Sequence, residues 1–523
     1  MKLFAELLDR LLYTPSRNAK IALLVAYLKN APDPDRGWAL AAFTGDLDLQ
    51  TVKAAGIRRL VESRVDPALF AWSYDYVGDL AETTALIWSG AANTDKWPRL
   101  SGVVDRLQQT ARGQSLHLVE EWLDQLDATG RWALLKLLTG GLRVGVSAGL
   151  AKNAVATYGN VESAHIEEVW HSLTPPYREL FDWLDGSAER PDPGERAVFR
   201  SPMLAHPIGE NELDGIDPQT FAAEWKWDGI RVQISARKDE VKLYSRSGDD
   251  ISHSFPDVVE ALGFEGVLDG ELLVVKDGAV QSFQELQLRL NRKRVTKKLL
   301  QDQPAFIRLY DLLFDGTEDI RELPFAERRR RLEHFVARQQ NPNMDISPLV
   351  PFSDLNHLKT LRDASRENGT EGLMLKQLGS PYIAGRPKGL WFKWKRDPLH
   401  VDTVLMYAQR GHGKRSSFYS DYTFGAWRED GELVPVGKAY FGFTDEELKQ
   451  IDKWVRDHTI KKYGPVREVE RGLVFEVAFD SVHPSPRHKS GIAMRFPRIA
   501  RIRWDKPAEE ADRVETLSAF IKS

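Results

Sequence analysis

The chain has 523 residues, of which 42% are hydrophobic, and a formal net charge of −4 with a sequence pI near 6.4. This length predicts about three or four domains, and the weakly acidic balance neither requires nor excludes a nucleic-acid partner, because a basic face can coexist with acidic ones. The chain contains no cysteine, which excludes disulfides and thiolate zinc sites.

Residues 1–190 are predicted to form an all-α domain. Apolar residues recur at helical spacing before and after Ser16, which is a plausible helix N-cap. They are Leu3, Leu7, Leu8 and Leu11, then Ile21, Leu24, Val25 and Leu28. Further apolar runs follow at 133–146 and 169–184, and strand patterns are scarce.

The N-terminus lacks the pattern of a signal peptide. Glu6, Asp9 and Arg10 interrupt its apolar residues, which the apolar region of a signal peptide does not tolerate. The sequence contains no apolar run of about 18 residues, so we expect no membrane span. A cytoplasmic protein is the simplest interpretation.

Residues 186–196 are predicted to be a linker, since this stretch is rich in proline, glycine and charge without periodicity. Short β-type runs follow at 231–234, 241–244 and 266–275. Helical patterns return at 327–338 and 355–367. We therefore expect an α+β domain over 200–397 that is built on antiparallel sheets.

The pattern changes again near Pro398. Short apolar strands alternate with turns such as Arg428-Glu429-Asp430-Gly431, and one helix is indicated at 444–458. Over 398–523 this pattern predicts a small β-barrel of the OB-fold type.

The hexapeptide Lys226-Trp227-Asp228-Gly229-Ile230-Arg231 combines a lysine, a carboxylate, a glycine and an arginine at short spacing. A lysine amine is a nucleophile only when it is neutral, which near pH 7 requires burial or a cationic neighbour. Arg231 and a bound metal could supply that positive charge. The alternative interpretation is a surface strand in which an ordinary lysine and arginine flank a turn.

Two acids and one aromatic residue stand out in the strands that come after the hexapeptide. Asp269 and Glu271 are two positions apart in an apolar strand, so alternation places them on the same face. Acids on such a strand are usually ion-paired or metal-bound, because an unpaired buried charge is costly. Tyr310 precedes an acid in the run 307–316 and either fills the core or stacks on a planar base.

Several basic residues suit phosphate contacts. Arg246 stands at a strand end before a glycine turn, and Lys393 and Lys395 share one face of a strand, where they repel each other unless an anion lies between them. The run 495–506 is basic with interleaved aromatic residues, which fits either a solvated edge strand or a phosphate contact. Glu371 and Lys376 stand at the two ends of a further strand-like run.

Taken in this order, these segments resemble the six motifs of the covalent nucleotidyltransferases, and specifically the ATP-dependent DNA ligases, from about Pro202 to Lys506. The resemblance implies that Lys226 is adenylated and that Arg503 and Lys506 orient the leaving pyrophosphate. The other implied contacts are Glu224 with the adenine edge, Arg231 and Arg246 with ribose and phosphate, Glu271 and Glu371 with ribose or metal, Tyr310 with the base, and Lys393 and Lys395 with the α-phosphate.

The same resemblance implies an activity and its cofactors. We expect sealing of 3′-hydroxyl/5′-phosphate nicks in duplex DNA through lysyl-AMP and DNA-adenylate, with ATP and Mg²⁺ or Mn²⁺, in DNA repair, replication or recombination. The expected state is a monomer that encircles DNA when bound. Residues 134–146 resemble the helical DNA-binding domain of larger ligases. There the amides near Gly140, Gly141 and Gly145 would approach a phosphate, although these glycines could equally end a helix.

Several interpretations stay open. Pro387 stands where many relatives carry a basic residue, and Arg386 is a doubtful replacement for that contact. Candidate DNA-contacting patches are 292–294, 297–298 and 141–143, whereas the four arginines 328–331 are interpreted as a solvated helix face. Rival functions are an RNA ligase, an mRNA-capping guanylyltransferase and a non-catalytic nucleic-acid clamp. An NAD⁺-dependent ligase is disfavoured, because its zinc site uses cysteines.

Overall fold

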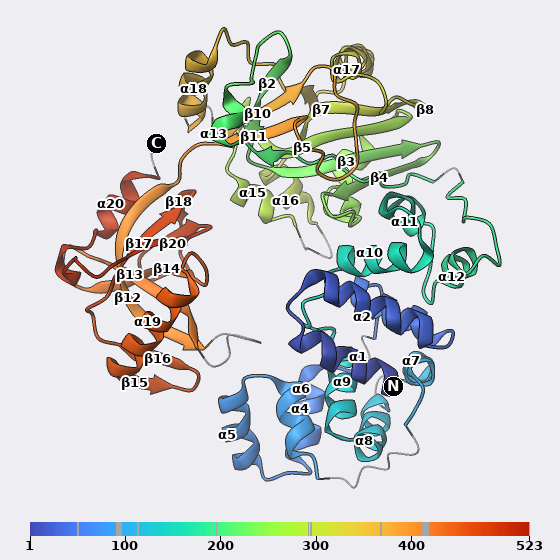
Figure 1. The fold of residues 1–523 in the computed structure, drawn as a ribbon, viewed down its shortest axis with the longest axis vertical. Coiled ribbons are helices and arrows are strands. Elements are labelled where there is room, and N and C mark those ends of the chain that lie inside the picture. Colours follow the sequence, from blue (N-terminus) through green and yellow to red (C-terminus); the bar gives the residue numbers. More distant parts are fainter. Residues whose placement is uncertain are drawn as a thin grey trace. The chain divides into compact units, whose positions relative to one another are not determined.

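The computed structural model describes residues 1–49, 52–89, 97–111, 114–194, 196–290, 292, 295–366, 369–410 and 418–521. The chain forms two compact units, of which one contains 1–154 together with 397–523 and the other contains 155–396. Figure 1 shows the chain coloured from the blue N-terminal helices to the red C-terminal strands.

The N-terminal region is helical, as the apolar spacing predicted. Its helices are α1 (Lys2–Tyr13), α2 (Arg17–Asn30), α3 (Asp35–Thr44), α4 (Ala54–Glu62), α5 (Pro67–Val77), α6 (Leu80–Ile87), α7 (Leu100–Gln109), α8 (Ser115–Gln125), α9 (Ala128–Thr139) and α10 (Ala148–Gly159). Ser16 caps α2 by accepting a hydrogen bond from the amide of Ala19. Leu7, Leu8 and Leu11 of α1 are buried, whereas Leu3 is 43% exposed, so the predicted apolar stripe packs from Leu7 onward.

The unit 155–396 begins with α11 (Ser163–Trp170) and α12 (Arg178–Leu184) and continues into two sheets. Glu168 of α11 connects these helices to later parts of the unit through three ion pairs. It pairs with Arg190 at 2.7 Å, Arg200 at 3.6 Å and Arg321 at 3.7 Å. The predicted linker at 186–196 therefore contributes an ion pair to the unit, although its described residues form neither helix nor strand.

The first sheet has the order β1-β11-β10-β2, and the second has the order β4-β3-β5-β7-β8, with β6 on β5 and β9 on β7. The strands are β1 (His206–Pro207), β2 (Phe221–Trp227), β3 (Ile230–Arg237), β4 (Glu240–Ser245), β5 (Gly266–Lys276), β6 (Ala279–Val280), β7 (Ala305–Asp315), β8 (Glu318–Asp319), β9 (Met344–Ile346), β10 (Thr370–Gln377) and β11 (Trp391–Lys395). Most pairs are antiparallel, but β1 with β11 and β7 with β9 are parallel. Both sheets are thus mixed, where purely antiparallel sheets were expected.

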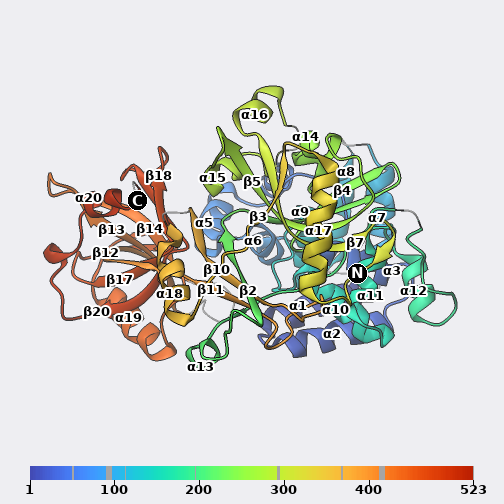
Figure 2. The ribbon, with the colours of Figure 1, turned by 90° about the horizontal axis from the view of Figure 1, so that it is seen from above.

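Helices cover the sheets of this unit. They are α13 (Glu210–Leu213), α14 (Pro256–Glu260), α15 (Phe283–Gln287), α16 (Lys297–Asp302), α17 (Phe325–Gln339) and α18 (Leu355–Asp363). Figure 2 shows α17 lying across the second sheet, where it packs against β7. Its apolar residues Phe325, Leu332 and Phe335 are buried.

Over its described residues, the C-terminal region is a sheet domain with two α-helices. Its strands are β12 (Leu399–Arg410), β13 (Tyr419–Trp427), β14 (Leu433–Ala439), β15 (Thr459–Tyr463), β16 (Val466–Val469), β17 (Val474–Phe479), β18 (Ser481–Pro484), β19 (Ile492–Arg495) and β20 (Arg498–Arg503). The helices are α19 (Asp445–Asp457) and α20 (Val514–Ala519). Thr444 and Glu447 form a capping box at the start of α19.

Strand pairing in this domain follows an open path. The order is β14-β13-β12-β16-β15, with β17 on β12 and β20 on β17, and β18 and β19 form a separate pair. Among the described residues these pairings do not close into a barrel, so the OB fold stays a prediction. Over the same residues, none of the helices combines the length and the apolar character that crossing a membrane requires.

Candidate active site

Lys226 lies near the end of β2, next to the central strand β10 of the first sheet. Its amine forms an ion pair with Glu371, which also pairs with Lys395 at 3.2 Å. Burial opposes ionisation of Glu371, but the charges of Lys226 and Lys395 hold its pKa below the ordinary value. One carboxylate therefore serves two ammonium groups.

The two acids of β5 have different surroundings. Asp269 is 1% exposed and pairs with Arg231 of β3, and it also accepts a hydrogen bond from the Tyr382 hydroxyl at 2.6 Å. The Glu271 carboxylate has no hydrogen bond or ion pair among the described residues. Burial, aided by the nearby charges of Glu371 and Asp269, raises its pKa to about 8. Asp269 thus fixes Arg231, whereas Glu271 has capacity for a cation.

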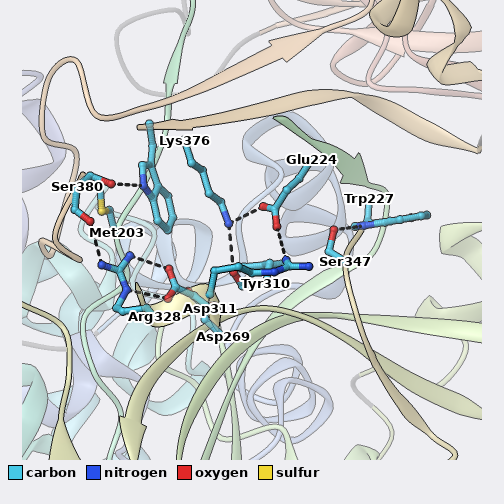
Figure 3. A network of polar contacts seen from close by, with 12 residues as sticks. Met203, Glu224, Trp227, Asp269, Tyr310, Asp311, Arg328, Ser347, Lys376 and Ser380 are labelled. Atoms are coloured by element: carbon cyan, nitrogen blue, oxygen red, sulfur yellow. Dashed lines mark hydrogen bonds and ion pairs between the residues drawn. The ribbon is translucent and has the colours of Figure 1, made fainter. Parts of the chain in front are cut away.

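Glu224 and Lys376 are buried and lie together with the partly buried Tyr310 (Figure 3). The Lys376 amine lies 2.6 Å from Glu224 and 4.8 Å from the centre of the Tyr310 ring. Arg329 of α17 contacts the other oxygen of Glu224 at 3.1 Å. The carboxylate two positions before Lys226 is therefore held by two cations.

Several cations gather near Lys226 and repel one another. Burial first, and then the charges of Arg386, Arg246, Lys226 and Lys395, lower the pKa of Lys393. Burial together with the charges of Arg231 and Arg386 likewise lowers the pKa of Arg246. A bound anion would relieve this repulsion, and a phosphate would satisfy several of these groups at once.

Gly229 of the hexapeptide has a packing role. A Cβ atom at this position would lie 2.4 Å from the carbonyl oxygen of Leu272 and 2.8 Å from Cγ of Glu271. Only glycine therefore permits the turn between β2 and β3 to lie against β5 without displacing the backbone. This contact brings the hexapeptide close to Glu271.

Arg503 and Lys506 share one acid within the C-terminal sheet domain. Arg503 ends β20 and lies 3.1 Å from the Asp402 carboxylate of β12, and Lys506 lies 2.7 Å from the same oxygen. The contacts described for Arg503 and Lys506 lie inside this domain. The domain belongs to one compact unit of the chain, and Lys226 belongs to the other.

Comparison with known proteins identifies the family. A family model described as "ATP dependent DNA ligase domain" matches residues 202–395, and one described as "ATP dependent DNA ligase C terminal region" matches 415–506. A probable DNA ligase from Koribacter versatilis is 31% identical over 561 residues, which cover 100% of this chain and 97% of that protein. The chain belongs to the ATP-dependent DNA ligases.

One further relative and one solved structure are similar to the chain. The ligase is 31% identical to DNA ligase 1 of Korarchaeum cryptofilum, over 99% of this chain and 97% of that one. A solved structure named Pmar-Lig_PreS3 superimposes with a TM-score of 0.60 at 17% identity, covering 96% of the ligase and 99% of that chain. At this identity the superposition supports the fold alone.

The ligase offers two carboxylates for a metal. The described residues contain no group of three or more histidine, aspartate or glutamate side chains placed to hold an ion. Mg²⁺ is commonly bound by one or two carboxylates together with substrate phosphates. Glu271, which forms no ion pair within the described part of the chain, and the neighbouring Glu371 match that donor set.

One sequence interpretation, that the arginines 328–331 form a solvated helix face, is wrong for two of its four residues. Arg328 is 0% exposed and pairs with Asp311, and Arg329 is 9% exposed, whereas Arg330 is 58% exposed as predicted. The signal was present in the sequence. Positions 328 and 329 fall on the helical stripe of Phe325 and Leu332, which is the face that packs.

The site also contains four residues to which the sequence analysis gave no role there. Asp269, the partner of Arg231, and Lys376 were noted only as charged residues of strands. Tyr382 was not noted, and Arg329 was placed on a solvated helix face. All strands of the second sheet lie between Glu224 and Lys376 in the sequence, so no local pattern links the two residues. Asp269 was noted as an acid, but its pairing with Arg231 depends on β3 and β5 being neighbours.

The segment after α9 contains the glycines that were interpreted either as a phosphate contact or as a helix end. Gly140 has a positive φ of 69° and ends α9, so the helix-end interpretation is correct for it. The buried Lys20 amine donates to the carbonyls of Val144 and Gly145, which fixes the segment. Arg143, Arg292, Lys297 and Lys298 are exposed. Residues 293 and 294 of the predicted patch lie outside the described residues.

Proposed function

We propose that this ligase seals 3′-hydroxyl/5′-phosphate nicks in duplex DNA through an AMP group carried on Lys226. The supporting observation is the position of the Lys226 amine. It pairs with Glu371, lies near Glu271, and contributes to the repulsion that lowers the pKa of Lys393. A nucleophile, carboxylates and phosphate-binding cations are thus within one group of strands.

ATP would bind between the two sheets of the unit 155–396. Tyr310 would stack on the adenine, and Glu224 would accept a hydrogen bond from its exocyclic amine. Arg231 and Arg246 would contact the ribose and phosphates, with Arg231 oriented by its ion pair with Asp269. Lys393 and Lys395 would bind the α-phosphate.

The first step requires a neutral Lys226. The Lys226 amine donates a hydrogen bond to Glu371, so this carboxylate is placed to take the proton before the attack. The amine then attacks the α-phosphorus, a P–N bond forms and pyrophosphate leaves. Mg²⁺ or Mn²⁺ held by Glu271 and Glu371 would neutralise charge on the phosphate oxygens.

Two transfers complete the reaction. The 5′-phosphate at the nick attacks the lysyl-AMP phosphorus, which breaks the P–N bond and gives DNA-adenylate. The 3′-hydroxyl then attacks the 5′-phosphate, and AMP leaves as the phosphodiester bond forms. Lys393 and Lys395 would stabilise the negative charge that develops in each step.

The three-domain organisation belongs to this proposal. Residues 1–190 would bind duplex DNA, 200–397 would carry the chemistry, and 398–523 would form an OB-type barrel that places Arg503 and Lys506 on the pyrophosphate. The chain would act as a monomer that encircles the DNA. The exposed cations Arg143, Lys297 and Lys298 support phosphate contacts to the duplex.

Lys226→Ala is the direct test. With labelled ATP and Mg²⁺, the wild-type chain should form a covalent protein–AMP adduct that survives denaturing electrophoresis, and the variant should form none. Lys242→Ala on β4, which removes a surface lysine paired with Asp250, is the matched control and should keep the adduct. An undiminished adduct in Lys226→Ala would refute the assignment.

The choice of nucleotide and strand separates the rivals. Labelled ATP should give the adduct, and labelled GTP or NAD⁺ should not. An adduct with GTP would indicate a capping enzyme, and an adduct with NAD⁺ would indicate an NAD⁺-dependent ligase. Sealing should be faster on nicked DNA than on nicked RNA. Binding of nicked DNA without any ATP-dependent sealing would identify a non-catalytic clamp.

A further inference from the structure

Arg329 reaches the carboxylate next to the candidate nucleotide site from a different element, helix α17. Its Nη1 atom lies 3.1 Å from one oxygen of Glu224, while the Lys376 amine lies 2.6 Å from the other. Figure 3 shows the Lys376 amine between Glu224 and Tyr310, with a dashed line to each residue. Each carboxylate oxygen accepts about two hydrogen bonds, so Glu224 keeps acceptor capacity after both cations are bound.

The position of the Arg329 guanidinium is fixed by its surroundings. Its Nε atom donates to Glu333 at 2.9 Å, one helical turn along α17. The preceding residue, Arg328, is fully buried and pairs with Asp311 at 2.8 Å, which anchors this turn of the helix to β7. Arg329 therefore approaches Glu224 from a rigid element, and a rigid donor fixes the orientation of its acceptor.

The two cations also determine which hydrogen-bonding role Glu224 can take. Burial raises the pKa of Glu224, and Lys376 and Arg329 oppose that rise. An ionised carboxylate only accepts hydrogen bonds, whereas a protonated one can donate. The 6-amino group of adenine is a donor, and the 6-oxo group of guanine or hypoxanthine is an acceptor.

We propose that Arg329 is a positioning residue that keeps Glu224 an oriented, acceptor-only group and so sets the preference for a 6-amino over a 6-oxo purine. This inference rests on the proposed function, in which Glu224 faces the edge of the base. Lys376 alone would leave one oxygen of a buried carboxylate without a cation. A neutral form that can donate to a 6-oxo group would then become accessible.

The test compares ATP with inosine triphosphate, which carries a 6-oxo group where ATP carries the 6-amino group. The rate and KM of lysyl-nucleotide formation are measured for the wild-type chain and for Arg329→Met. The ratio of kcat/KM between ATP and inosine triphosphate should fall by about tenfold in the variant, since losing one oriented polar contact relaxes discrimination by roughly this factor. Arg329→Lys keeps a cation and should restore part of the ratio.

Arg330→Met is the matched control, because Arg330 is the next residue of α17, is 58% exposed and pairs with Glu327 on the surface. Its ratio should equal that of the wild-type chain. Glu333 is 53% exposed, and Glu333→Gln weakens its ion pair with Arg329. This change should lower the ratio by a smaller factor than Arg329→Met. It also provides a test if Arg329→Met does not fold.

The outcomes are distinguishable. Equal losses with ATP and inosine triphosphate in Arg329→Met and Glu333→Gln would show a structural role and overturn the inference. Failure of the wild-type chain to form an adduct with either nucleotide would instead refute the proposed function. A selective loss that Arg329→Lys partly reverses would support the positioning role.

Discussion

The pKa of Glu271 is unusually high for a carboxyl group beside a candidate phosphate site. Burial raises its pKa to about 8 from an ordinary value of 4.5. Near neutral pH, without a metal, most of the population should therefore be protonated. Under the proposed function, a metal ion and this proton would compete for the same oxygens.

The raised pKa of Glu271 predicts a pH dependence of stability in metal-free solution. Because the folded chain holds the Glu271 proton more tightly than the unfolded chain, stability present at low pH should be lost as the pH rises from about 5 to 8. Urea unfolding of Glu271→Gln in EDTA should show a shallower loss over this range. Glu260→Gln, at an exposed site on α14, should match the wild-type slope. Parallel slopes for all three chains would contradict the raised pKa.

At the scale of single residues, local patterns in the sequence selected groups that the structure brings together, but did not indicate all of their partners. Lys226, Glu371 and Lys395 were each selected from local spacing, and the structure brings them together. The pair between Arg231 and Asp269 could not be read from spacing, because it depends on the register of β3 against β5. Charge compensation between distant strands leaves no local pattern.

Helix α17 illustrates how one element combines packing with buried charge. Arg328 and Asp311 are both 0% exposed and lie 2.8 Å apart between α17 and β7. Removing one member of a buried pair leaves an uncompensated charge in a region of low dielectric constant. This pair therefore matters more to stability than the exposed pairs on the opposite face of the helix.

We expect Arg328→Leu to lower the free energy of unfolding by about 3–5 kcal/mol. Arg330→Leu, which removes an exposed pair, should change the free energy of unfolding far less. The double change Arg328→Leu with Asp311→Leu should recover much of the loss, because both charges are then absent. Urea unfolding monitored by tryptophan fluorescence measures each difference, and equal effects of the two single changes would contradict the buried pair.

Among the elements, those with local signals were predicted correctly. The cap at Ser16, the helix indicated at 444–458, and the alternation in β3 and β4 all correspond to observed helices or strands. The buried face of α17 was misjudged, because four consecutive arginines resemble a solvated surface and the underlying apolar stripe was given too little weight. The parallel pairs of β1 and β9 involve two or three residues each, which is too short for a pattern.

At the scale of the whole molecule, the proposed cycle divides work between units. Arg503 and Lys506 are held by Asp402 within the C-terminal domain, so they would have to exchange this partner for pyrophosphate during the first step. The later sealing step involves no pyrophosphate. The two steps should therefore depend on Lys506 to different extents.

Lys506→Ala should slow self-adenylation by at least about tenfold, on the scale of one lost charge-assisted contact. Sealing of a nick that already carries AMP should be affected much less. Single-turnover assays with labelled ATP and with pre-adenylated DNA measure the two steps separately. Lys489→Ala removes a surface lysine of the same domain and should leave both rates unchanged. Equal loss in both assays for Lys506→Ala would contradict this division.

The order of domain-scale patterns along the chain was predictable, because helical spacing gives way to strand alternation near position 200. Closure of the C-terminal strands was not, since a barrel differs from an open sheet only in which strands pair. The described pairings leave β14 and β15 at the ends of the path.

The sharing of Glu371 by Lys226 and Lys395 has a consequence for the resting enzyme. Under the proposed function, both amines would exchange this carboxylate for phosphate oxygens when ATP binds, and Glu371 would then be available to a metal ion. Nucleotide binding and metal binding would thus be linked through a single carboxylate.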